Sequence, residues 1–149
     1  MVYFHSVKVG LFMAWLAAFL CVCLAAPLDQ DNLSETCSDI HLSGFSLEAT
    51  CCGGSSNQEF KNELDLNLCI GIDYNKDALQ WGIYGKLSLY CTNCTLEKTP
   101  EPGNFLECAC RSLGNTVSSV STLRLDDGIK NINGSLTCMG GGAVVHPLK

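Results

Sequence analysis

A hairpin pattern occurs twice in this chain, and this duplication constrains the fold more than any other feature. The later copy, 123–138, begins with alternating apolar residues, breaks at Asp-Asp-Gly, resumes at Ile129 and turns at Asn133-Gly134. Asn-Gly between two apolar runs is the strongest short-range signal of a hairpin, because both residues tolerate positive φ. The earlier copy runs from Leu64 to Trp81. Two copies of one hairpin predict a protein built from two similar units.

The duplication extends over most of the chain. Leucines, isoleucines and cysteines recur in the same order, at offsets that change only inside loops, as in a true internal repeat. The repeats span about 31–82 and 86–138, with a joint at Gly82–Gly85. Matched pairs at offsets of 54 to 59 residues are Leu33/Leu87, Cys37/Cys91, Cys51/Cys110, Ile70/Ile129 and Leu79/Leu136.

Each repeat contains short alternating strands bounded by turn residues, and helical periodicity is poor throughout. We therefore expect an all-β protein with two pseudo-symmetric halves. A unit of roughly 50 residues buries too little surface to be stable alone, so we expect the halves to pack together and disulfides to reinforce them. The tail, 139–149, contains three consecutive glycines and is expected to be disordered.

Residues 1–25 are predicted to be a signal peptide. Lys8 provides a positive start, 9–24 is nearly all apolar, and Cys23 and Ala25 place small residues at the two positions that signal peptidase reads. A transmembrane anchor is the alternative, but the apolar run is short and no second span follows. We expect cleavage after Ala25, an extracellular protein, and no membrane span in the mature chain.

The predicted mature chain has 8 basic and 15 acidic side chains, a net charge near −7. Nucleic acids and anionic membranes need basic patches, so neither is expected as a partner. Catalysis is not indicated, because only His41 and His146 remain and no nucleophile elbow or catalytic zinc motif is present. Asp126 and Asp127 are neighbours that would point to opposite faces of a strand, so a turn or cap role suits them better. No metal or other cofactor is expected.

Nine of the eleven cysteines lie after residue 25. A secreted chain this rich in cysteine is expected to form disulfides, and the odd number predicts one thiol left over or paired between chains. Cys91-x-x-Cys94 with Cys108-x-Cys110 could instead form a four-sulfur zinc site. An oxidising destination favours the disulfides.

The sequence resembles the cyanovirin-N family, in the type found in fungi. The match covers Leu33 to Cys138, and its most specific pieces are Leu64-Asp65-Leu66-Asn67, Leu79-Gln80-Trp81 and the hairpin 125–136. The resemblance implies an elongated pseudo-twofold fold in which each half has a three-stranded sheet and a β-hairpin, with strands exchanged between the halves. It also implies a non-catalytic lectin that binds mannose-containing glycans at two sites near opposite ends.

The resemblance implies one disulfide in each repeat, and position suggests two more. Cys94 and Cys108 stand where the first repeat has the apolar residues Ile40 and Ala49, so a bridge would replace a facing apolar pair. A last pair lies on the two hairpins. Cys52 is then left over as an exposed or capped thiol, or as a contact between two chains. The expected bridges are Cys37–Cys51, Cys91–Cys110, Cys94–Cys108 and Cys69–Cys138.

Sugar recognition needs dense, pre-positioned hydrogen-bonding groups on a shallow surface. The family builds site one from the N-terminal arm, the loop after the second cysteine and the last hairpin. Site two comes from the first hairpin, the joint and the loop after the fourth bridging cysteine. Site one comprises Asp31, Asn32, Glu35, Thr36, Cys52, Gly53, Gly54, Asn131, Ile132 and Asn133. Site two comprises Gly71, Ile72, Lys76, Gly85, Lys86, Leu89, Tyr90, Arg111, Ser112 and Asn115.

Alternatives remain at both sites. Asn133-Gly134 could serve the turn alone. Site two departs from the family pattern, because its hairpin turn is two residues longer and Leu89 stands where the family can place a carboxylate. One working site is therefore an alternative to two. Trp81 ends an apolar hairpin strand, so we expect it in the core rather than stacked on a sugar.

Three glycosylation sequons begin at Asn32, Asn93 and Asn133. Two of them lie in site one, where an attached glycan would obstruct sugar binding. A second interpretation is a cysteine-rich secreted protein that keeps the scaffold but binds a protein partner. The chain is expected as a monomer or as a dimer that exchanges hairpins through the joint.

Overall fold

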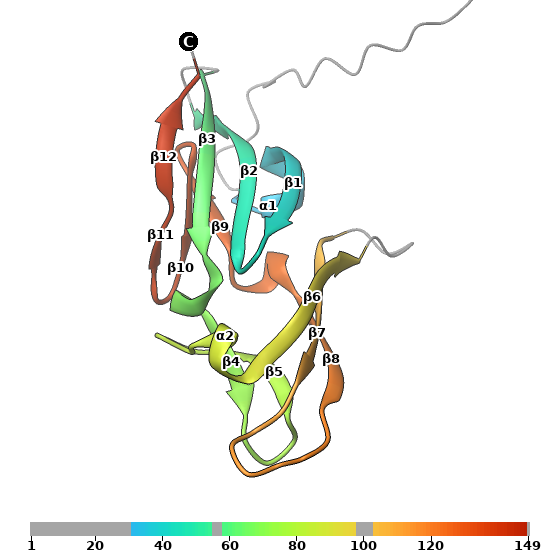
Figure 1. Cartoon of the computed structure of the whole chain (residues 1–149). Coiled ribbons are helices and arrows are strands. Elements are labelled where there is room, and N and C mark those ends of the chain that lie inside the picture. The colour runs from blue at the N-terminus through green and yellow to red at the C-terminus, as the bar shows by residue number, and fades with distance from the viewer. Residues whose placement is uncertain (1–30, 55–57, 98–102, 149) are drawn as a thin grey trace, which may run out of the picture.

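Two sheets and two hairpins form an elongated molecule (Figure 1). The structure, a computed structural model, describes residues 31–54, 58–97 and 103–148, so the predicted signal peptide lies outside it. The elements of the first repeat are α1 (Leu33–Thr36), β1 (Cys37–Ser43), β2 (Ser46–Gly53), β3 (Gln58–Asp65), the 3-10 helix η2 (Leu66–Leu68), β4 (Ile70–Asp73) and β5 (Ala78–Trp81). Those of the second repeat are α2 (Leu87–Tyr90), β6 (Cys91–Glu97), β7 (Phe105–Cys110), β8 (Ser119–Arg124), η3 (Leu125–Asp127), β9 (Lys130–Ile132) and β10 (Ser135–Cys138), followed by β11 (Gly141–Gly142) and β12 (Val144–Pro147).

Each repeat forms an antiparallel sheet of its own. β1, β2 and β3 pair in order in the first repeat, and β6, β7 and β8 do so in the second. Residues of β2 alternate between buried and half-buried, as expected for a strand with one face on the core. A register shift interrupts β1 near Asp39 and β6 near Asn93, and both residues have positive φ. The equivalent bulges show that the repeat extends to local backbone detail.

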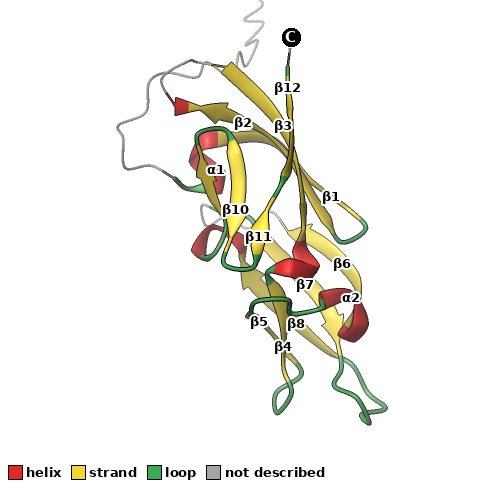
Figure 2. Ribbon diagram, turned by 90° about the vertical axis from the view of Figure 1, so that its left-hand side faces the viewer, coloured by secondary structure: helices red, strands yellow, loops and turns green. Residues whose placement is uncertain are grey.

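The hairpins are exchanged between the halves. The β9–β10 hairpin of the second repeat packs against β2 and β3 of the first, and β5 of the first repeat packs against β7 and β8 of the second (Figure 2). The all-β, pseudo-symmetric architecture predicted from the sequence is therefore confirmed, as is the strand exchange that the family resemblance implies. Each half contains strands from both repeats, so neither repeat completes a half by itself.

Equivalent apolar residues of the two repeats form the core. Fully buried side chains include the matched pairs Leu33/Leu87, Leu47/Leu106, Leu66/Leu125 and Ile70/Ile129. Trp81 is half-buried and packs against this core, as predicted. Its ring lies on Gly128, where an added Cβ would be 2.5 Å from the indole, so the position requires glycine. The indole thus joins the first hairpin to the second repeat.

Four disulfides join the pairs that the sequence predicts: Cys37–Cys51, Cys69–Cys138, Cys91–Cys110 and Cys94–Cys108. The zinc alternative for the second repeat is excluded, because its four sulfurs form disulfides. Cys52 is disulfide-bonded as well. It is therefore not the spare thiol that the cysteine count predicts.

The C-terminal segment corrects one expectation. The sequence predicts disorder for 139–149, but within the described part of this segment β11 pairs with β10 and β12 pairs with the outer edge of β3. Val144 lies opposite Glu63 and Pro147 opposite Phe60, which makes the first sheet four-stranded. The Cys69–Cys138 bridge holds the start of this segment, and the edge of β3 offers backbone groups for it to pair with. Composition alone does not reveal that edge.

Within the described ranges, no helix is long and apolar enough to cross a membrane. The same residues contain no group of three or more histidine, cysteine or acidic side chains that could hold a metal ion.

Candidate functional site

Site one forms where three segments of the chain meet. The arm at Asp31 joins β9, because the Asn131 N–H donates to the Asp31 carbonyl at 2.8 Å and Asn32 forms a β-bridge with Lys130. The loop after Cys51 joins the same hairpin, because Gly54 lies directly against the Asn133 side chain. The structure therefore brings together the three segments that the resemblance assigns to this site.

Asn131 holds these segments rather than facing solvent. Its side chain is buried, its Nδ2 donates to the Cys52 carbonyl at 2.9 Å, and its Oδ1 accepts the Gly134 N–H at 2.9 Å. Both ends of the amide are thus used inside the protein. We assign Asn131 a positioning role, which differs from the direct sugar contact that the resemblance suggests.

The exposed part of site one is polar except for Ile132. Asp31, Glu35, Gly54, Ile132 and Asn133 are exposed, and Asn32 and Thr36 are half-buried. Asn133 has φ +52°, the left-handed conformation that the hairpin turn requires. Lys130, which no sequence pattern indicates as a site residue, donates from Nζ to the Asn32 Oδ1 at 3.2 Å. Donors and acceptors thus lie side by side on a backbone that neighbouring strands fix.

A carboxylate from the other repeat fixes helix α1 beside site one. Asp126 of η3 accepts the Ser34 N–H at 2.8 Å and the Asn104 N–H at 2.9 Å. Burial by itself would raise the pKa of Asp126, but these hydrogen bonds and nearby Arg124 outweigh it and hold the pKa below 3.8. Asp126 therefore serves as a cap, as its position in the sequence suggests, although the helix that it caps is 92 residues away in the chain.

A side chain from the opposite repeat also caps the helix in the other half. Asn67 of η2 accepts the Ser88 N–H of α2 at 2.8 Å. Asn67 and Asp126 are equivalent at the repeat offset of 59. The two four-residue helices were not predicted, because one turn shows no periodicity and the groups that cap them lie in the other repeat.

Site two forms at the equivalent position of the other half. Gly71 of β4 lies against the joint, where an added Cβ would be 2.5 Å from the Gly85 carbonyl oxygen. The loop after Cys110 joins the hairpin through Asp77, whose carboxylate accepts the Ser112 N–H and an Asn115 amide hydrogen, both at 2.5 Å. Hydrogen bonds from Ser112, and then from Asn115, lower the pKa of Asp77 below its usual value.

The surface of site two differs from that of site one. Tyr74 and Tyr90 meet edge to face with ring centroids 5.4 Å apart, and the Tyr74 hydroxyl donates to that of Tyr90 at 3.0 Å. Leu89 is 57% exposed and Leu113 is 77% exposed. Ile72 is buried in the core, so its side chain is not available to a ligand. Lys76, Lys86 and Arg111 are exposed.

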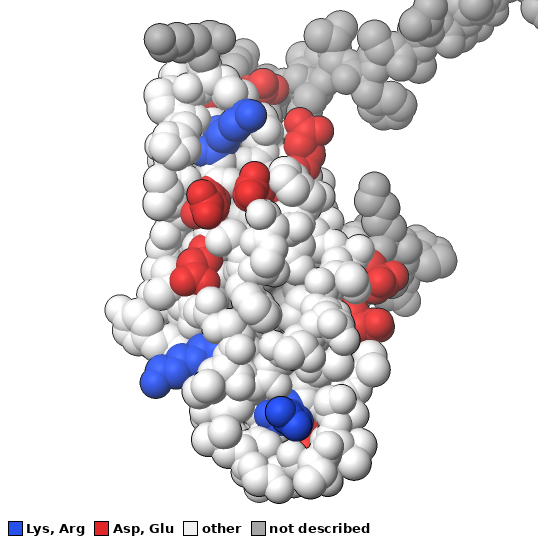
Figure 3. Space-filling view, in the orientation of Figure 1, with Lys and Arg blue, Asp and Glu red and all other residues white. Residues whose placement is uncertain are grey.

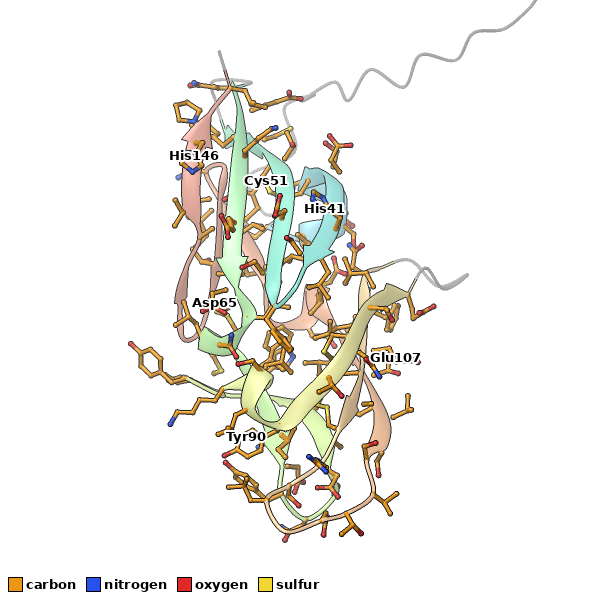
Figure 4. All side chains as sticks on the ribbon, in the orientation of Figure 1. His41, Cys51, Asp65, Tyr90, Glu107 and His146 are labelled. Atoms are coloured by element: carbon orange, nitrogen blue, oxygen red, sulfur yellow. A yellow bond between two sulfur atoms is a disulfide. The ribbon has the colours of Figure 1, made fainter. Side chains whose placement is uncertain are left out.

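The two sites lie far apart. Tyr90 lies in the lower half of the molecule, whereas Cys51 lies in the upper sheet that carries site one (Figure 4). On the face shown in Figure 3, acidic side chains gather over β2 and β3, and the few basic ones are scattered. This face therefore offers no continuous basic surface.

A family model, the CVNH domain, matches residues 33–137, which cover both repeats. The chain belongs to the CVNH family. This confirms membership of the cyanovirin-N family, which the sequence resembles.

Two solved CVNH structures share the fold. The NMR structure of GzCVNH from Gibberella zeae is 24% identical, with a TM-score of 0.61; the match covers 71% of this chain and 95% of that one. The crystal structure of a MoCVNH3 variant (Mo0v) in complex with (N-GlcNAc)4 is 19% identical, with a TM-score of 0.62; the match covers 72% of this chain and 97% of that one. No match was found among the curated proteins.

The segments that the sequence assigns to each candidate site lie together in the structure, next to residues that the sequence did not indicate. Asp77 and Tyr74 lie in the lengthened turn of site two, and Lys130 directly precedes Asn131. The polar run 73–77 was the available signal for Asp77 and Tyr74. The partners of Asp77 are 35 and 38 residues away, so no local pattern indicates them.

Proposed function

We propose that this protein is a secreted, non-catalytic lectin that recognises mannose-type glycans through site one. The observation that carries the proposal is the convergence of arm, loop and hairpin on the buried Asn131 amide, which leaves exposed polar groups on a fixed backbone. Pre-positioned groups lose little freedom on binding, so a shallow polar surface can hold a sugar.

Membership of the CVNH family and a carbohydrate complex of a relative support sugar binding. The sugar in that relative, a MoCVNH3 variant, is (N-GlcNAc)4. N-acetylglucosamine oligomers are therefore the natural competitors in any test of mannose specificity. The predicted signal peptide and the disulfides support secretion.

A glycan array tests the sugar class. Purified, deglycosylated protein would be applied to mannose oligosaccharides and N-acetylglucosamine oligomers, with folding checked by circular dichroism. We expect signal on terminal mannose. Signal on N-acetylglucosamine oligomers alone would retain the lectin and overturn the mannose assignment, whereas no signal from folded protein would overturn the lectin.

The variant Asn133→Gly separates sugar contact from turn formation. Glycine keeps the positive φ but removes the amide. We expect the affinity for the array ligand to fall by about tenfold, which corresponds to about 1.4 kcal/mol, while Tm is nearly unchanged. Asp39→Gly is the matched control, because Asp39 also has positive φ (51°) but lies outside both sites. Equal affinity in the two variants would show that Asn133 serves only the turn.

One observation favours a protein partner as a second candidate. Leu113, Val117 and Val120, in the loop after Cys110 and on β8, are 70 to 77% exposed. Exposed apolar residues close together in one segment are typical of protein-binding surfaces. The double variant Leu113→Ser/Val117→Ser would abolish capture of such a partner while leaving glycan binding at site one intact. Loss of glycan binding in this variant would contradict the assignment to site one.

A further inference from the structure

The three sequons differ in whether glycosylation is compatible with sugar binding at site one. A glycan on Asn32 or Asn133 would cover that site. We infer that Asn93 is the N-glycosylated residue and that Asn32 and Asn133 stay unmodified. The inference rests on the proposed secretion and on the proposed use of site one. It resolves the conflict between glycosylation and sugar binding that the sequence poses.

Asn32 is held by hydrogen bonds to its carbonyl oxygen and its side-chain oxygen. Its carbonyl accepts the Thr36 Oγ1 hydrogen at 2.7 Å and the Thr36 N–H at 3.1 Å, and its side-chain Oδ1 accepts from Lys130. Its backbone pairs with β9. An oligosaccharide on Nδ2 would extend past Lys130 and across the exposed surface of site one.

Asn133 also lies within site one. Its Oδ1 lies 2.8 Å from where a Cβ on Gly54 would stand, so the amide lies on the loop that completes site one. A sugar attached to Nδ2 of this exposed amide would start within the surface of site one, next to that loop. Modification at Asn133 is therefore incompatible with ligand entry.

Asn93 has none of these constraints. It lies on β6, the edge strand of the second sheet, at the register shift between Thr92 and Thr95. Its side chain is exposed and forms no hydrogen bond within the described part of the chain. With φ +54°, the residue stands in the bulge, away from the strand ladder. A glycan can therefore extend into solvent without displacing any contact, on the sheet that does not carry site one.

The modification is a group transfer from a lipid pyrophosphate-linked oligosaccharide. The Asn93 Nδ2 forms a bond to C1 of the reducing-end N-acetylglucosamine and loses one proton. The bond between C1 and the pyrophosphate oxygen breaks, and its electron pair leaves with the lipid pyrophosphate. The Thr95 hydroxyl completes the acceptor sequon, and in the folded protein it donates to the Glu97 Oε1 at 3.1 Å on the exposed face of β6.

The experiment expresses the full chain in a eukaryotic secretory host and maps glycopeptides before and after treatment with an N-glycanase. We expect one glycan per chain, on Asn93. Thr95→Ala should abolish it, whereas the matched control Thr95→Ser, which preserves the sequon, should retain it. An unmodified Asn93, wherever the protein is recovered, or a glycan on Asn32 or Asn133 would overturn the inference.

A glycan array on the same protein preparations tests sugar binding separately from the position of the glycan. Glycosylated protein and the Thr95→Ala variant should bind the array ligand with affinities within about twofold of each other. If glycosylated protein gains at least tenfold on enzymatic deglycosylation, the Asn93 glycan obstructs the site and the placement argument is wrong. If neither preparation binds, the lectin proposal fails while the glycan map still stands.

Discussion

At the scale of single residues, polar side chains from one repeat satisfy backbone groups of the other. Asp126 accepts two N–H groups, one of them on α1. Asn67, a neutral amide, accepts an N–H group of α2. The two equivalent helices are thus capped by two side chains of nearly equal shape. Charge is the difference between them.

Substitutions at Asp126 should separate charge from shape. We expect Asp126→Asn to cost about 1 kcal/mol of unfolding free energy, because the amide still accepts one N–H but charge-assisted hydrogen bonds are the stronger kind. Asp126→Ala should cost about 2–3 kcal/mol, because two N–H groups then lose their acceptor. Urea unfolding at neutral pH measures both values. An alanine variant no less stable than the asparagine variant would contradict the capping role.

The lowered pKa of Asp126 also predicts a pH dependence. A carboxyl whose folded pKa is below its unfolded value of 3.8 contributes stability that is fully present above that value. The contribution is lost as the pH falls through the folded pKa. Thermal unfolding of the parent protein between pH 6 and about pH 2 should therefore show a larger drop in Tm than unfolding of Asp126→Asn. Parallel pH profiles would show that Asp126 does not titrate with folding.

At the scale of elements, each third strand holds the hairpin of the other repeat. On β3, the buried Asn62 donates to the Gly134 carbonyl at 2.9 Å and accepts the Leu136 N–H at 2.8 Å. On β8, Ser121 accepts the Leu79 N–H at 2.9 Å. Asn62 and Ser121 are equivalent at the repeat offset of 59, and so are their roles.

The two contacts differ in strength, which predicts unequal effects of alanine. Asn62→Ala should destabilise the protein by about 2–3 kcal/mol, because a buried donor and a buried acceptor lose their partners, whereas Ser121→Ala should cost about 1 kcal/mol. Hydrogen exchange of residues 130–137 should accelerate in the first variant and that of 78–81 in the second. A larger loss of stability at Ser121 would contradict this ranking.

At the scale of the whole molecule, disulfides differ in what they constrain. Cys69–Cys138 spans 69 residues and ties the first hairpin region to the end of the last hairpin, beyond which the chain continues into β11 and β12. Cys94–Cys108 lies within the loop that Cys91–Cys110 already closes. A bridge inside a closed loop removes little further freedom from the unfolded chain.

Paired removal of these bridges should show the difference. Cys69→Ala with Cys138→Ala should cost about 4 kcal/mol in the chain-entropy model, and Cys94→Ala with Cys108→Ala about 1–2 kcal/mol. Unfolding in guanidinium under non-reducing conditions measures both. Loss of the first bridge should also release β12 from β3, which hydrogen exchange of 144–147 would detect. Equal losses would mean that chain entropy does not determine the effect.

The repeat and the hairpin turns follow from the sequence alone, because each depends on residue types at fixed spacings. Gly and Asn mark turns through their tolerance of positive φ, and apolar alternation identifies strands with one buried face. The resemblance to the cyanovirin-N family implies two of the bridges, and the positions of the remaining cysteines suggest the other two.

The folded chain, and not the sequence, shows which polar side chains hold the halves together, how the tail pairs and which part of each site faces solvent. Asn131 and Asn133 are two residues apart and chemically alike, yet one is buried among hydrogen bonds and the other is exposed. Their difference arises from segments up to 100 residues away in the chain. Hydrogen bonds and strand edges that form only when the repeats exchange their hairpins have no signature in a local pattern.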